Sequence, residues 1–545
     1  MELDRAACDR ARKSRDARFD GRFFIAVITT KIYCRPICPA RSPHDHNIRY
    51  YPTAAAAEAA GFRPCLRCRP EASPGTPAWF GTSSVVSRAL RLIGDGALDR
   101  QSVDGFADRL GVTSRHLRRL FVQHLGATPI EVALTRRVQS AKKLLDETRL
   151  PFTQVAMAAG FGSLRRFNSE IRRTYSRTPT ELRRLAKRPL AQSGCYRFRL
   201  AYRPPYDWEA LVGFLSARAT PGVESVDRSG YRRTIAINGT TGSIAVAPVT
   251  GSPAFTLEVR FPNPNMLLTI VERVKHMFDV AADPAVIAEH LAVDPLLEKA
   301  GSAHTGIRVP GAWDPFELAV RAILGQQISV RAATTIAGRV ATRWGSPVEA
   351  GAGLDRLFPT AAQLQNAPIE DAGVIASRAG AIRALAGAIH DGTLVFDAAS
   401  CLEALRSIPG IGEWTTQYVA MRALNEPDAF LCGDLVLRKM AGNCSPHQLD
   451  ARAEQWRPWR AYAVMLLWQS AVDSRQFPPS RPKAAPARPR RSSHANQRAE
   501  AGTVSVKSRQ SSRQSAVQGE HRAKTTSARR RPRDRRNHVA TAASR

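Results

Sequence analysis

The chain has 545 residues, which corresponds to about three or four domains at roughly 150 residues each. Its 80 Lys and Arg residues outnumber its 47 Asp and Glu residues, so the formal net charge is +33 and a polyanionic partner, nucleic acid first, is expected. The sequence has no apolar run of membrane-spanning length and no apolar secretion signal in its charged first segment. Composition therefore excludes a secreted, membrane or collagen-like protein and predicts a cytoplasmic one.

The hydrophobic pattern changes along the chain and predicts a multidomain α+β architecture. Residues 1–76 contain two close cysteine pairs, and residues 83–187 have helical spacing and many arginines. From about 195 to 275, the segments YRFRLAY, RRTIAI, SIAVAPV and FTLEVRF have strand character and surround one expected helix, DWEALVGFLSARA. Residues 285–473 return to helical spacing. Residues 476–545 are poor in apolar side chains, and from Arg481 they hold 18 Lys or Arg against three Asp or Glu, which predicts a disordered basic tail.

Four of the nine cysteines form two short-spaced pairs, Cys34 with Cys38 and Cys65 with Cys68, separated by 26 residues. An odd number of cysteines in a cytosolic chain argues against a disulfide framework. Two such pairs predict a tetrahedral four-thiolate zinc site. On spacing alone, a purely structural zinc ion that stabilises a small domain remains an alternative. The other cysteines are scattered and are expected to be ordinary thiols: Cys8, Cys195, Cys401, Cys432 and Cys444.

Two helix-turn-helix patterns lie in the arginine-rich unit, in VDGFADRLGVTSRHLRRLFVQHLG and FTQVAMAAGFGSLRRFNSEIRRTY. In each, small or apolar residues precede a turn glycine, and a helix with polar leading residues follows, which suits entry into a DNA major groove. The alternative for either pattern alone is a helical hairpin with a solvated basic face. One long helix, PIEVALTRRVQSAKKLLDE, joins the two. The side chains expected to contact DNA include Arg115, Arg119, Arg165 and Arg166.

The segment LRSIPGIGEWT predicts a tight turn between two helices, with Gly410 and Gly412 allowing close backbone approach. Amide groups at the start of the second helix can hold a DNA phosphate without reading sequence. A plain helix connection is the alternative. Asp434 follows twenty-two residues after Gly412, just before an apolar helix start. It is either a catalytic acid or only a helix cap.

These motifs resemble known families. CRPICPAR with GFRPCLRC resembles the zinc domain of the bacterial Ada adaptive-response family, and the helical unit after it resembles AraC-type DNA-binding domains. RPPYDWEALVGFLSARA, WDPFELAVRAILGQQISV, IPGIGEWTTQYVAMRAL and FLCGDLVLRK resemble AlkA-type glycosylases of the helix-hairpin-helix superfamily. The resemblances imply a small zinc domain (1–76), an all-α AraC-type double helix-turn-helix domain (83–187), an α+β AlkA-like N-terminal subdomain (195–303), an all-α helix-hairpin-helix glycosylase domain (304–475) and the tail (476–545).

The Ada resemblance implies that Cys34 accepts a methyl group irreversibly from a methylphosphotriester in the DNA backbone. Cys38, Cys65 and Cys68 would be the other ligands of a single Zn²⁺ that keeps the thiol deprotonated. Methylation would remove one negative charge from the site and raise DNA affinity, which would switch on a transcription activator that acts with RNA polymerase. Four neighbouring arginines are candidates for phosphate contact: Arg35, Arg41, Arg63 and Arg67.

The AlkA resemblance implies excision of alkylated purines of the 3-methyladenine and 7-methylguanine type, with Asp434 stabilising the oxocarbenium-like sugar or activating water. The damaged base would be flipped out of the duplex into an aromatic pocket that attracts a cationic base. The residues that match the pocket of the family are Trp414, Tyr418, Trp468 and Phe214, for each of which core packing is the alternative.

Departures from the families limit these expectations. Trp414 stands where lyase-competent relatives have a lysine, so a monofunctional glycosylase is expected. The segment after Asp434 lacks the four-cysteine run of relatives with an iron–sulfur cluster, so no cluster is expected. Gln327 stands where the family inserts a leucine wedge into DNA. The chain also lacks the Pro-Cys-His-Arg motif of a second methyltransferase domain.

The favoured function is therefore that of a bifunctional DNA alkylation repair protein. Its N-terminal half would be a sensor and transcription regulator, and its C-terminal half would be a glycosylase. One alternative is a transcription regulator whose C-terminal half binds DNA without catalysing a reaction. The other is a glycosylase whose zinc ion is only structural. We expect a monomer in the bacterial cytoplasm, associated with the nucleoid, with double-stranded DNA as its partner and no membrane contact.

Overall fold

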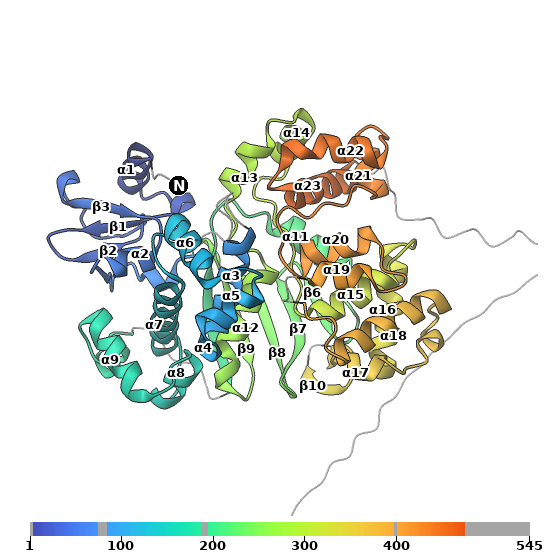
Figure 1. Ribbon diagram of the computed structural model, residues 1–545, viewed down its shortest axis with the longest axis horizontal. Helices are drawn as coiled ribbons and strands as arrows, with labels where there is room; N and C mark the ends of the chain where they lie inside the picture. The colour runs from blue at the N-terminus through green and yellow to red at the C-terminus, as the bar shows by residue number, and fades with distance from the viewer. Residues whose placement is uncertain (1–3, 75–83, 187–193, 352, 397–399, 475–545) are drawn as a thin grey trace, which may run out of the picture. The chain divides into compact units, whose positions relative to one another are not determined.

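The computed structural model describes residues 4–74, 84–186, 194–351, 353–396 and 400–474, which lie within one compact unit of the chain, Met1–Ser480 (Figure 1). The disordered tail expected over residues 476–545 lies outside the described residues. Among the helices described, none combines the length and the apolar character that a membrane span requires.

The N-terminal unit is a small sheet with helices, and its topology brings the two cysteine pairs together. Strand β1 pairs with β2 and β3 in antiparallel fashion, and β2 pairs with β4 in parallel, in the order β3-β1-β2-β4. Tyr33 of β2 lies opposite Pro64 of β4, so Cys34 and Cys65 leave neighbouring strands side by side. The elements are α1 Arg5–Ser14, η1 Ala17–Phe19, β1 Phe24–Val27, β2 Ile32–Cys34, η2 Asp45–Asn47, β3 Ile48–Tyr51, α2 Ala54–Ala59, β4 Arg63–Pro64 and η3 Pro70–Ala72.

The second unit is entirely helical over its described residues, and local capping signals set its boundaries. Thr113 caps α6 and Ser163 caps α9, each side chain accepting a backbone N–H of the following turn. Gly111 and Gly160 have φ of 74° and 87° in the turns before these helices, where glycine is favoured. The helices are α3 Ser84–Gly94, α4 Ala97–Arg100, α5 Val103–Arg109, α6 Ser114–Leu125, α7 Pro129–Glu147, α8 Phe152–Ala158, α9 Leu164–Tyr175 and α10 Pro179–Arg184.

The third unit is a five-stranded antiparallel sheet in the order β5-β9-β8-β7-β6. Alternating burial along β5, β8 and β9 follows the alternation of the sequence, with apolar side chains on the buried face. All four expected strands and the expected helix are present, and β6 is added at one edge. The elements are β5 Cys195–Ala201, α11 Trp208–Ser216, β6 Glu224–Asp227, β7 Gly230–Ile237, β8 Thr240–Pro248, β9 Ala254–Arg260, η4 Pro264–Met266 and α12 Leu267–Met277.

Over the described residues between 284 and 474, the chain is helical except for one short hairpin, β10–β11, which the helical expectation for 285–473 missed. Pro347 and glycines at 351 and 353, with φ of 72° and 77°, break the helical pattern there. The elements are α13 Pro284–Leu291, α14 Pro295–Ala303, α15 Pro315–Leu324, α16 Val330–Trp344, β10 Pro347–Gly351, β11 Leu354–Arg356, α17 Ala361–Leu364, η5 Ile369–Ala372, α18 Ala376–His390, α19 Cys401–Arg406, α20 Glu413–Arg422, α21 Leu435–Met440, α22 Pro446–Ala453, η6 Glu454–Trp456 and α23 Arg460–Asp473.

The packing of this helical part positions one site. Helix α15 packs against α20, and α21 packs against α23. A buried apolar cluster runs through α11, α20, α21 and α23, so the starts of α20 and α21 and the side chains of α23 face a common space. Figure 1 shows α20, α21 and α23 in orange and red, near α11 of the sheet unit.

Candidate functional site

The four paired cysteines form one cluster, as their spacing predicts. The Sγ atoms of Cys34, Cys38, Cys65 and Cys68 all lie within 4.8 Å of one another. In a tetrahedral site with Zn–S bonds of about 2.3 Å the sulfurs are about 3.8 Å apart, so this donor set fits a zinc ion. Cys65 and Cys68 are buried, whereas Cys34 and Cys38 are half-exposed. Cys34 is therefore within reach of a reactant from solvent.

Arg35, expected beside a DNA phosphate, instead supports the cysteine cluster from within. It is buried and forms an ion pair with Asp20, to which Nε also donates at 2.8 Å. Its backbone N–H donates to Cys68 Sγ at 3.4 Å, and Nη1 donates to the Cys68 carbonyl at 3.0 Å. Arg35 is thus a structural residue, because its charge is already paired. The other three candidate arginines remain accessible: Arg41 and Arg67 are exposed, and Arg63 is half-buried.

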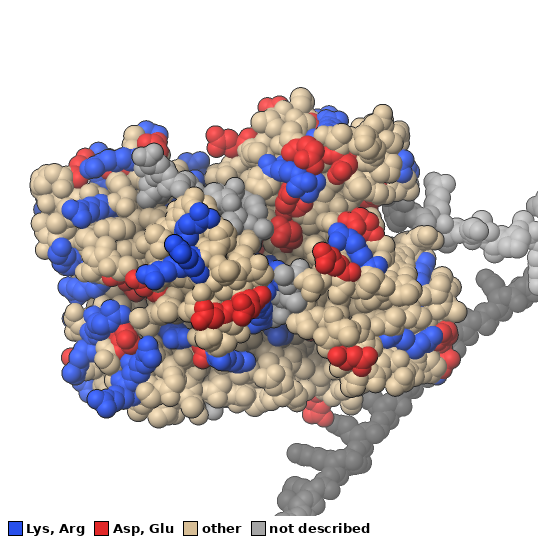
Figure 2. All heavy atoms as spheres, in the orientation of Figure 1, with Lys and Arg blue, Asp and Glu red and all other residues tan. Residues whose placement is uncertain are grey.

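The second helices of both helix-turn-helix patterns present basic side chains to solvent. The predicted residues Arg115, Arg119, Arg165 and Arg166 are all exposed, while the buried side chains of these helices include Leu117, Phe121 and Leu125 of α6 and Phe167 and Ile171 of α9. Figure 2 shows Lys and Arg side chains gathered over α6 and over α9. The arrangement suits a polyanionic surface.

The IPGIG segment forms a tight turn between α19 and α20. Gly410 has φ of 89°, and a Cβ there would lie 2.9 Å from Cβ of Ala381, so only glycine is accommodated without strain. Gly412 caps α20 without a side chain. The neighbouring loop supports the turn, because Gln326 Nε2 donates to the Gly410 carbonyl at 3.0 Å. The next residue, Gln327, is exposed and has φ of 55°.

Asp434 lies at the N-cap of α21, and its carboxylate accepts four N–H groups. Oδ1 accepts the backbone N–H of Val436 at 2.9 Å and of Leu437 at 3.0 Å, and Nε1 of Trp468 at 3.2 Å. Oδ2 accepts Nε1 of Trp414 at 3.0 Å. Asp434 therefore caps a helix, but it also faces two aromatic side chains, which a cap alone does not require.

These aromatic residues line a pocket of about 720 Å³ that also contains Asp434. The rings of Trp414 and Tyr418 are stacked, with centroids 5.1 Å apart and planes 10° apart. The Trp468 ring lies 6.3 Å from that of Tyr418. The size and the lining suit a single planar base. Three of the four predicted pocket residues are thus brought together around the acid.

Phe214, the fourth predicted pocket residue, packs behind the pocket lining. It is 9% exposed, and its ring stacks beside Trp468 at 6.2 Å. Cζ of Arg218 lies 3.7 Å from its ring centroid, and Cζ of Arg422 lies 4.9 Å from it. Arg218 and Arg422 line the pocket instead.

Sequence reasoning missed these two arginines and Arg321, which also lines the pocket. A signal was available, because Arg218 follows Phe214 by four residues and Arg422 follows Tyr418 by four residues. That spacing places each guanidinium over the preceding ring, along α20 for Arg422 and in the turn just after α11 for Arg218. Arg422 is buried, and it donates to the hydroxyl of Tyr418 at 2.7 Å and to the Pro310 carbonyl at 2.8 Å.

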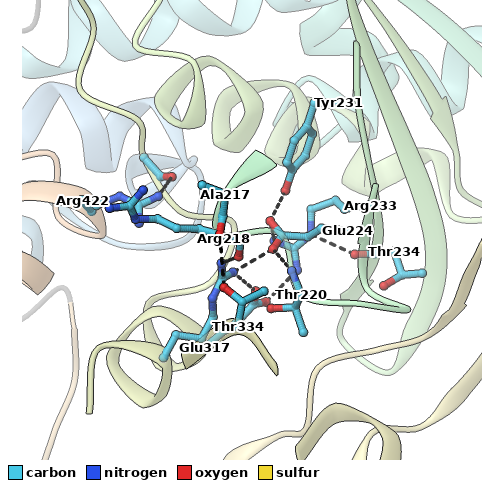
Figure 3. A network of polar contacts seen from close by, with 12 residues as sticks. Ala217, Arg218, Thr220, Glu224, Tyr231, Arg233, Thr234, Glu317, Thr334 and Arg422 are labelled. Atoms are coloured by element: carbon cyan, nitrogen blue, oxygen red, sulfur yellow. Dashed lines mark hydrogen bonds and ion pairs between the residues drawn. The ribbon is translucent and has the colours of Figure 1, made fainter. Parts of the chain in front are cut away.

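A buried polar network supports this wall of the pocket (Figure 3). Arg321 Nη1 donates to Glu224 Oε2 and to Glu317 Oε1, both at 2.9 Å. Arg233 Nη2 donates to Glu317 Oε2 at 2.6 Å, and the Tyr231 hydroxyl donates to Glu224 Oε1 at 2.6 Å. Burial alone would raise the pKa of Glu224, but Arg321 and Arg233 lower that pKa to about 2.

Each part of the chain is similar to known proteins. Family models match the metal binding domain of Ada at residues 7–71, a helix-turn-helix domain at 106–185 and the AlkA N-terminal domain at 197–314. The chain is 32% identical to the DNA-3-methyladenine glycosylase 2 of Escherichia coli, over 50% of this chain and 96% of that protein. A solved 3-methyladenine DNA-glycosylase from Archaeoglobus fulgidus is 21% identical with a TM-score of 0.45, over 51% of this chain and 99% of the other.

A relative of the whole chain combines all of these parts. The probable bifunctional transcriptional activator/DNA repair enzyme AlkA of Mycobacterium tuberculosis is 42% identical over 493 residues, covering 88% of this chain and 99% of that protein. The chain belongs to this family of bifunctional transcriptional activator/DNA repair enzymes, in which Ada-type metal-binding and helix-turn-helix domains precede an AlkA-type part.

Proposed function

We propose that the chain is a bifunctional DNA alkylation repair protein that excises alkylated purines at Asp434 and accepts methyl groups at Cys34. The observation that carries the proposal is the placement of Asp434, held by four N–H donors at the edge of an aromatic pocket. A protein that only grips DNA would need the turn at Gly410 and Gly412, but it would not need a fixed carboxylate beside a pocket.

In the glycosylase reaction, the pocket formed by Trp414, Tyr418 and Trp468 takes the flipped base, with Phe214 behind them. The bond between C1′ of the sugar and the base nitrogen breaks, and its electron pair leaves with the base. An alkylated purine that was cationic departs as a neutral molecule. Asp434 stabilises the positive charge that develops on the sugar, and water then adds to C1′ and loses a proton.

This glycosylase is monofunctional, because Trp414 offers no amine to form a covalent link to the sugar. The amides of the turn around Gly410 and Gly412 hold a backbone phosphate. Gln327, exposed on the adjoining loop, fills the gap left in the duplex and bonds the orphaned base.

In the methyl-transfer reaction, the Cys34 thiolate attacks the methyl carbon of a DNA methylphosphotriester. The new S–C bond forms as the C–O bond breaks, and the phosphodiester leaves as an anion. A single zinc ion bound by Cys34, Cys38, Cys65 and Cys68 would keep the thiols deprotonated near neutral pH. Cys34 and Cys38 are the half-exposed members of the cluster, and Cys34 is the first of them in the chain. The exposed Arg41 and the half-buried Arg63 are the candidates for phosphate contact.

Methyl transfer acts as a one-way electrostatic switch. The conversion of one thiolate into a thioether removes one negative charge, so the domain repels DNA phosphates less. Tighter binding then assists the helix-turn-helix domain, whose exposed arginines contact promoter DNA. The proposal has further parts. The protein activates RNA polymerase, acts as a monomer on the bacterial nucleoid in the cytoplasm, and has no iron–sulfur cluster. Its domains are residues 1–76, 83–187, 195–303, 304–475 and 476–545.

One experiment tests both activities. Duplex DNA carrying radiolabelled methyl groups is supplied in excess, and the label is followed into free base and into protein. The proposal predicts free 3-methyladenine over many turnovers and at most one methyl group per protein molecule. Cys34→Ala removes the protein label and leaves base release intact.

The other outcomes identify the alternatives. Label on the protein without release of base means that the C-terminal half binds DNA but does not excise bases. Release of base without label on the protein means that the metal site is only structural. Circular dichroism and thermal unfolding of Cys34→Ala and wild-type protein test whether the variant retains its fold, because Cys34 is itself a proposed zinc ligand.

A further inference from the structure

The wall of the pocket next to the end of α11 is formed by a cation. The guanidinium of Arg218 lies over the ring of Phe214, with Cζ 3.7 Å from the ring centroid, and Nη1 donates to the Phe214 carbonyl at 3.3 Å. Arg218 lines the pocket and Phe214 lies behind it. A base that enters on this side therefore meets N–H donors and a positive charge before it meets the aromatic ring.

The backbone that carries Arg218 is held at three successive points (Figure 3). Thr334 Oγ1 donates to the Ala217 carbonyl at 3.3 Å, Arg321 donates to the Arg218 carbonyl, and the Thr220 N–H donates to Glu224 Oε2 at 3.0 Å. Glu224 in turn is held by Arg321. This support fixes the position from which the Arg218 side chain enters the pocket.

The buried polar network of Glu224, Glu317, Arg321 and Arg233 provides no carboxylate to neutralise the charge of Arg218. Within it, Glu224 and Glu317 balance Arg321 and Arg233. In the part of the chain that the structure describes, no carboxylate forms an ion pair with Arg218 or Arg422, whose contacts are carbonyl oxygens, a phenol and aromatic rings. Asp434 alone opposes these two guanidiniums, so the pocket has one surplus positive charge.

The phenol of Tyr418 responds to this charge. Burial would raise the pKa of Tyr418, yet the pKa is lowered, because the guanidiniums of Arg422, Arg218 and Arg321 favour the phenolate. The pocket therefore combines ring faces, which attract the cationic alkylpurines of the proposed function, with a positive potential that opposes this attraction and does not oppose the binding of an uncharged base.

We infer that Arg218 is a specificity-determining residue of the glycosylase, which shifts the pocket toward uncharged purine lesions that carry an exocyclic oxygen. This inference rests on the proposed glycosylase function. A guanidinium N–H can donate to the oxygen or to a ring nitrogen at the edge of such a base. When the bond between C1′ and N9 of an uncharged purine breaks, the electron pair stays on N9 and the base leaves as an anion, which the positive wall stabilises. A cationic alkylpurine leaves as a neutral base and gains nothing from the charge.

The test compares two lesions in the same duplex sequence, hypoxanthine as the uncharged base with an exocyclic oxygen and 7-methylguanine as the cationic base. Single-turnover release rates are measured for wild-type protein, Arg218→Met, which keeps the length but removes the charge, and Arg218→Lys, which keeps the charge. We expect Arg218→Met to lower the ratio of hypoxanthine to 7-methylguanine release at least about tenfold, and Arg218→Lys to lower it less. Arg228→Met, at an exposed arginine in the turn between β6 and β7, is the matched control and leaves the ratio unchanged.

Three results would overturn the inference. The first is an Arg218→Met protein whose two release rates fall by the same factor, which indicates a structural role. The second is an Arg218→Met protein whose two release rates both equal those of the wild type. The third is a wild-type protein that releases 7-methylguanine but no hypoxanthine. A wild-type protein that releases neither base overturns the proposed function itself, so the two failures are distinguishable. Both release rates are measured on the same protein sample, so their ratio does not depend on the fraction of folded protein. Arg218→Lys provides a second test should Arg218→Met fold poorly.

Discussion

Nε1 of Trp414 donates to Oδ2 of Asp434 at 3.0 Å, while the Trp414 ring stacks on Tyr418 with centroids 5.1 Å apart. One residue thus forms a face of the base pocket and orients the acid. Among the described residues, Oδ1 of Asp434 accepts three N–H groups, whereas Oδ2 accepts only that of Trp414. Oδ2 is therefore the oxygen with free acceptor capacity, and in the proposed mechanism it is the one that would face the positive charge developing on the sugar.

The two tryptophans that hold Asp434 should differ in their effect on catalysis. Trp414→Phe removes the single donor to Oδ2 but keeps a ring to stack on Tyr418, and we expect about a tenfold or greater loss in single-turnover base release. Trp468→Phe removes one of three donors to Oδ1 and should cost about threefold. Both rates are measured with enzyme in excess over a duplex with one alkylated purine. A larger loss in Trp468→Phe than in Trp414→Phe would contradict the role given to Oδ2.

The two glycines of the turn should separate stability from DNA binding. Gly410→Ala places a side chain at φ of 89° and 2.9 Å from Cβ of Ala381, so we expect unfolding free energy to fall by about 1–2 kcal/mol. At Gly412 a Cβ meets nothing within 4 Å, so Gly412→Ala should leave stability unchanged. It should nevertheless weaken duplex binding, because the new methyl group stands where the backbone approaches a phosphate. Denaturant unfolding and fluorescence anisotropy measure the two effects. Wild-type affinity in Gly412→Ala would show that the turn only connects two helices.

The buried network behind Arg218 should make stability depend on acidic pH. The pKa of Glu224 is held at about 2 by Arg321 and Arg233 against 4.5 in the unfolded chain, although burial opposes this. The stabilisation is fully present above pH 4.5 and is lost as the pH falls toward 2, because the unfolded state then binds the proton more readily. We expect the stability difference between wild type and Glu224→Gln to shrink by up to roughly 3 kcal/mol over that range. Urea denaturation at a series of pH values measures the difference, and a difference that stays constant from pH 5 to 3 would refute the assignment.

Local signals in the sequence predicted much of the fold. The four expected strands of the sheet unit are present because β5, β8 and β9 alternate between buried and more exposed positions, while β7 is buried over most of its length. Helix α7 spans Pro129–Glu147, the same residues that were predicted, since Pro129 and a capping box of Thr128 with Glu131 mark its start. The cysteine cluster was predictable from spacing, and its geometry is confirmed by the parallel pairing of β2 with β4.

Contacts between distant segments were not predictable in the same way. Arg35 was expected beside phosphates, but it pairs with Asp20, because the chain folds the two together inside the N-terminal unit. The partners of Glu224 include Arg321, almost a hundred residues away, and no local pattern joins them. Asp434 was either a cap or a catalytic acid from sequence, and the structure shows that capping by Oδ1 leaves Oδ2 available. The two interpretations are thus compatible.

Asp434→Asn tests the central claim most directly, because asparagine caps a helix as well as aspartate does but carries no charge. Release of 3-methyladenine from methylated duplex DNA is measured under single-turnover conditions, together with duplex affinity and thermal stability. The account predicts that release falls by at least about a hundredfold, while duplex affinity stays close to that of the wild type and stability falls by no more than about 1–3 kcal/mol, because the amide nitrogen of asparagine cannot accept the Trp414 N–H. Release at a rate near that of the wild type would contradict the account, since the acid would then be only a helix cap.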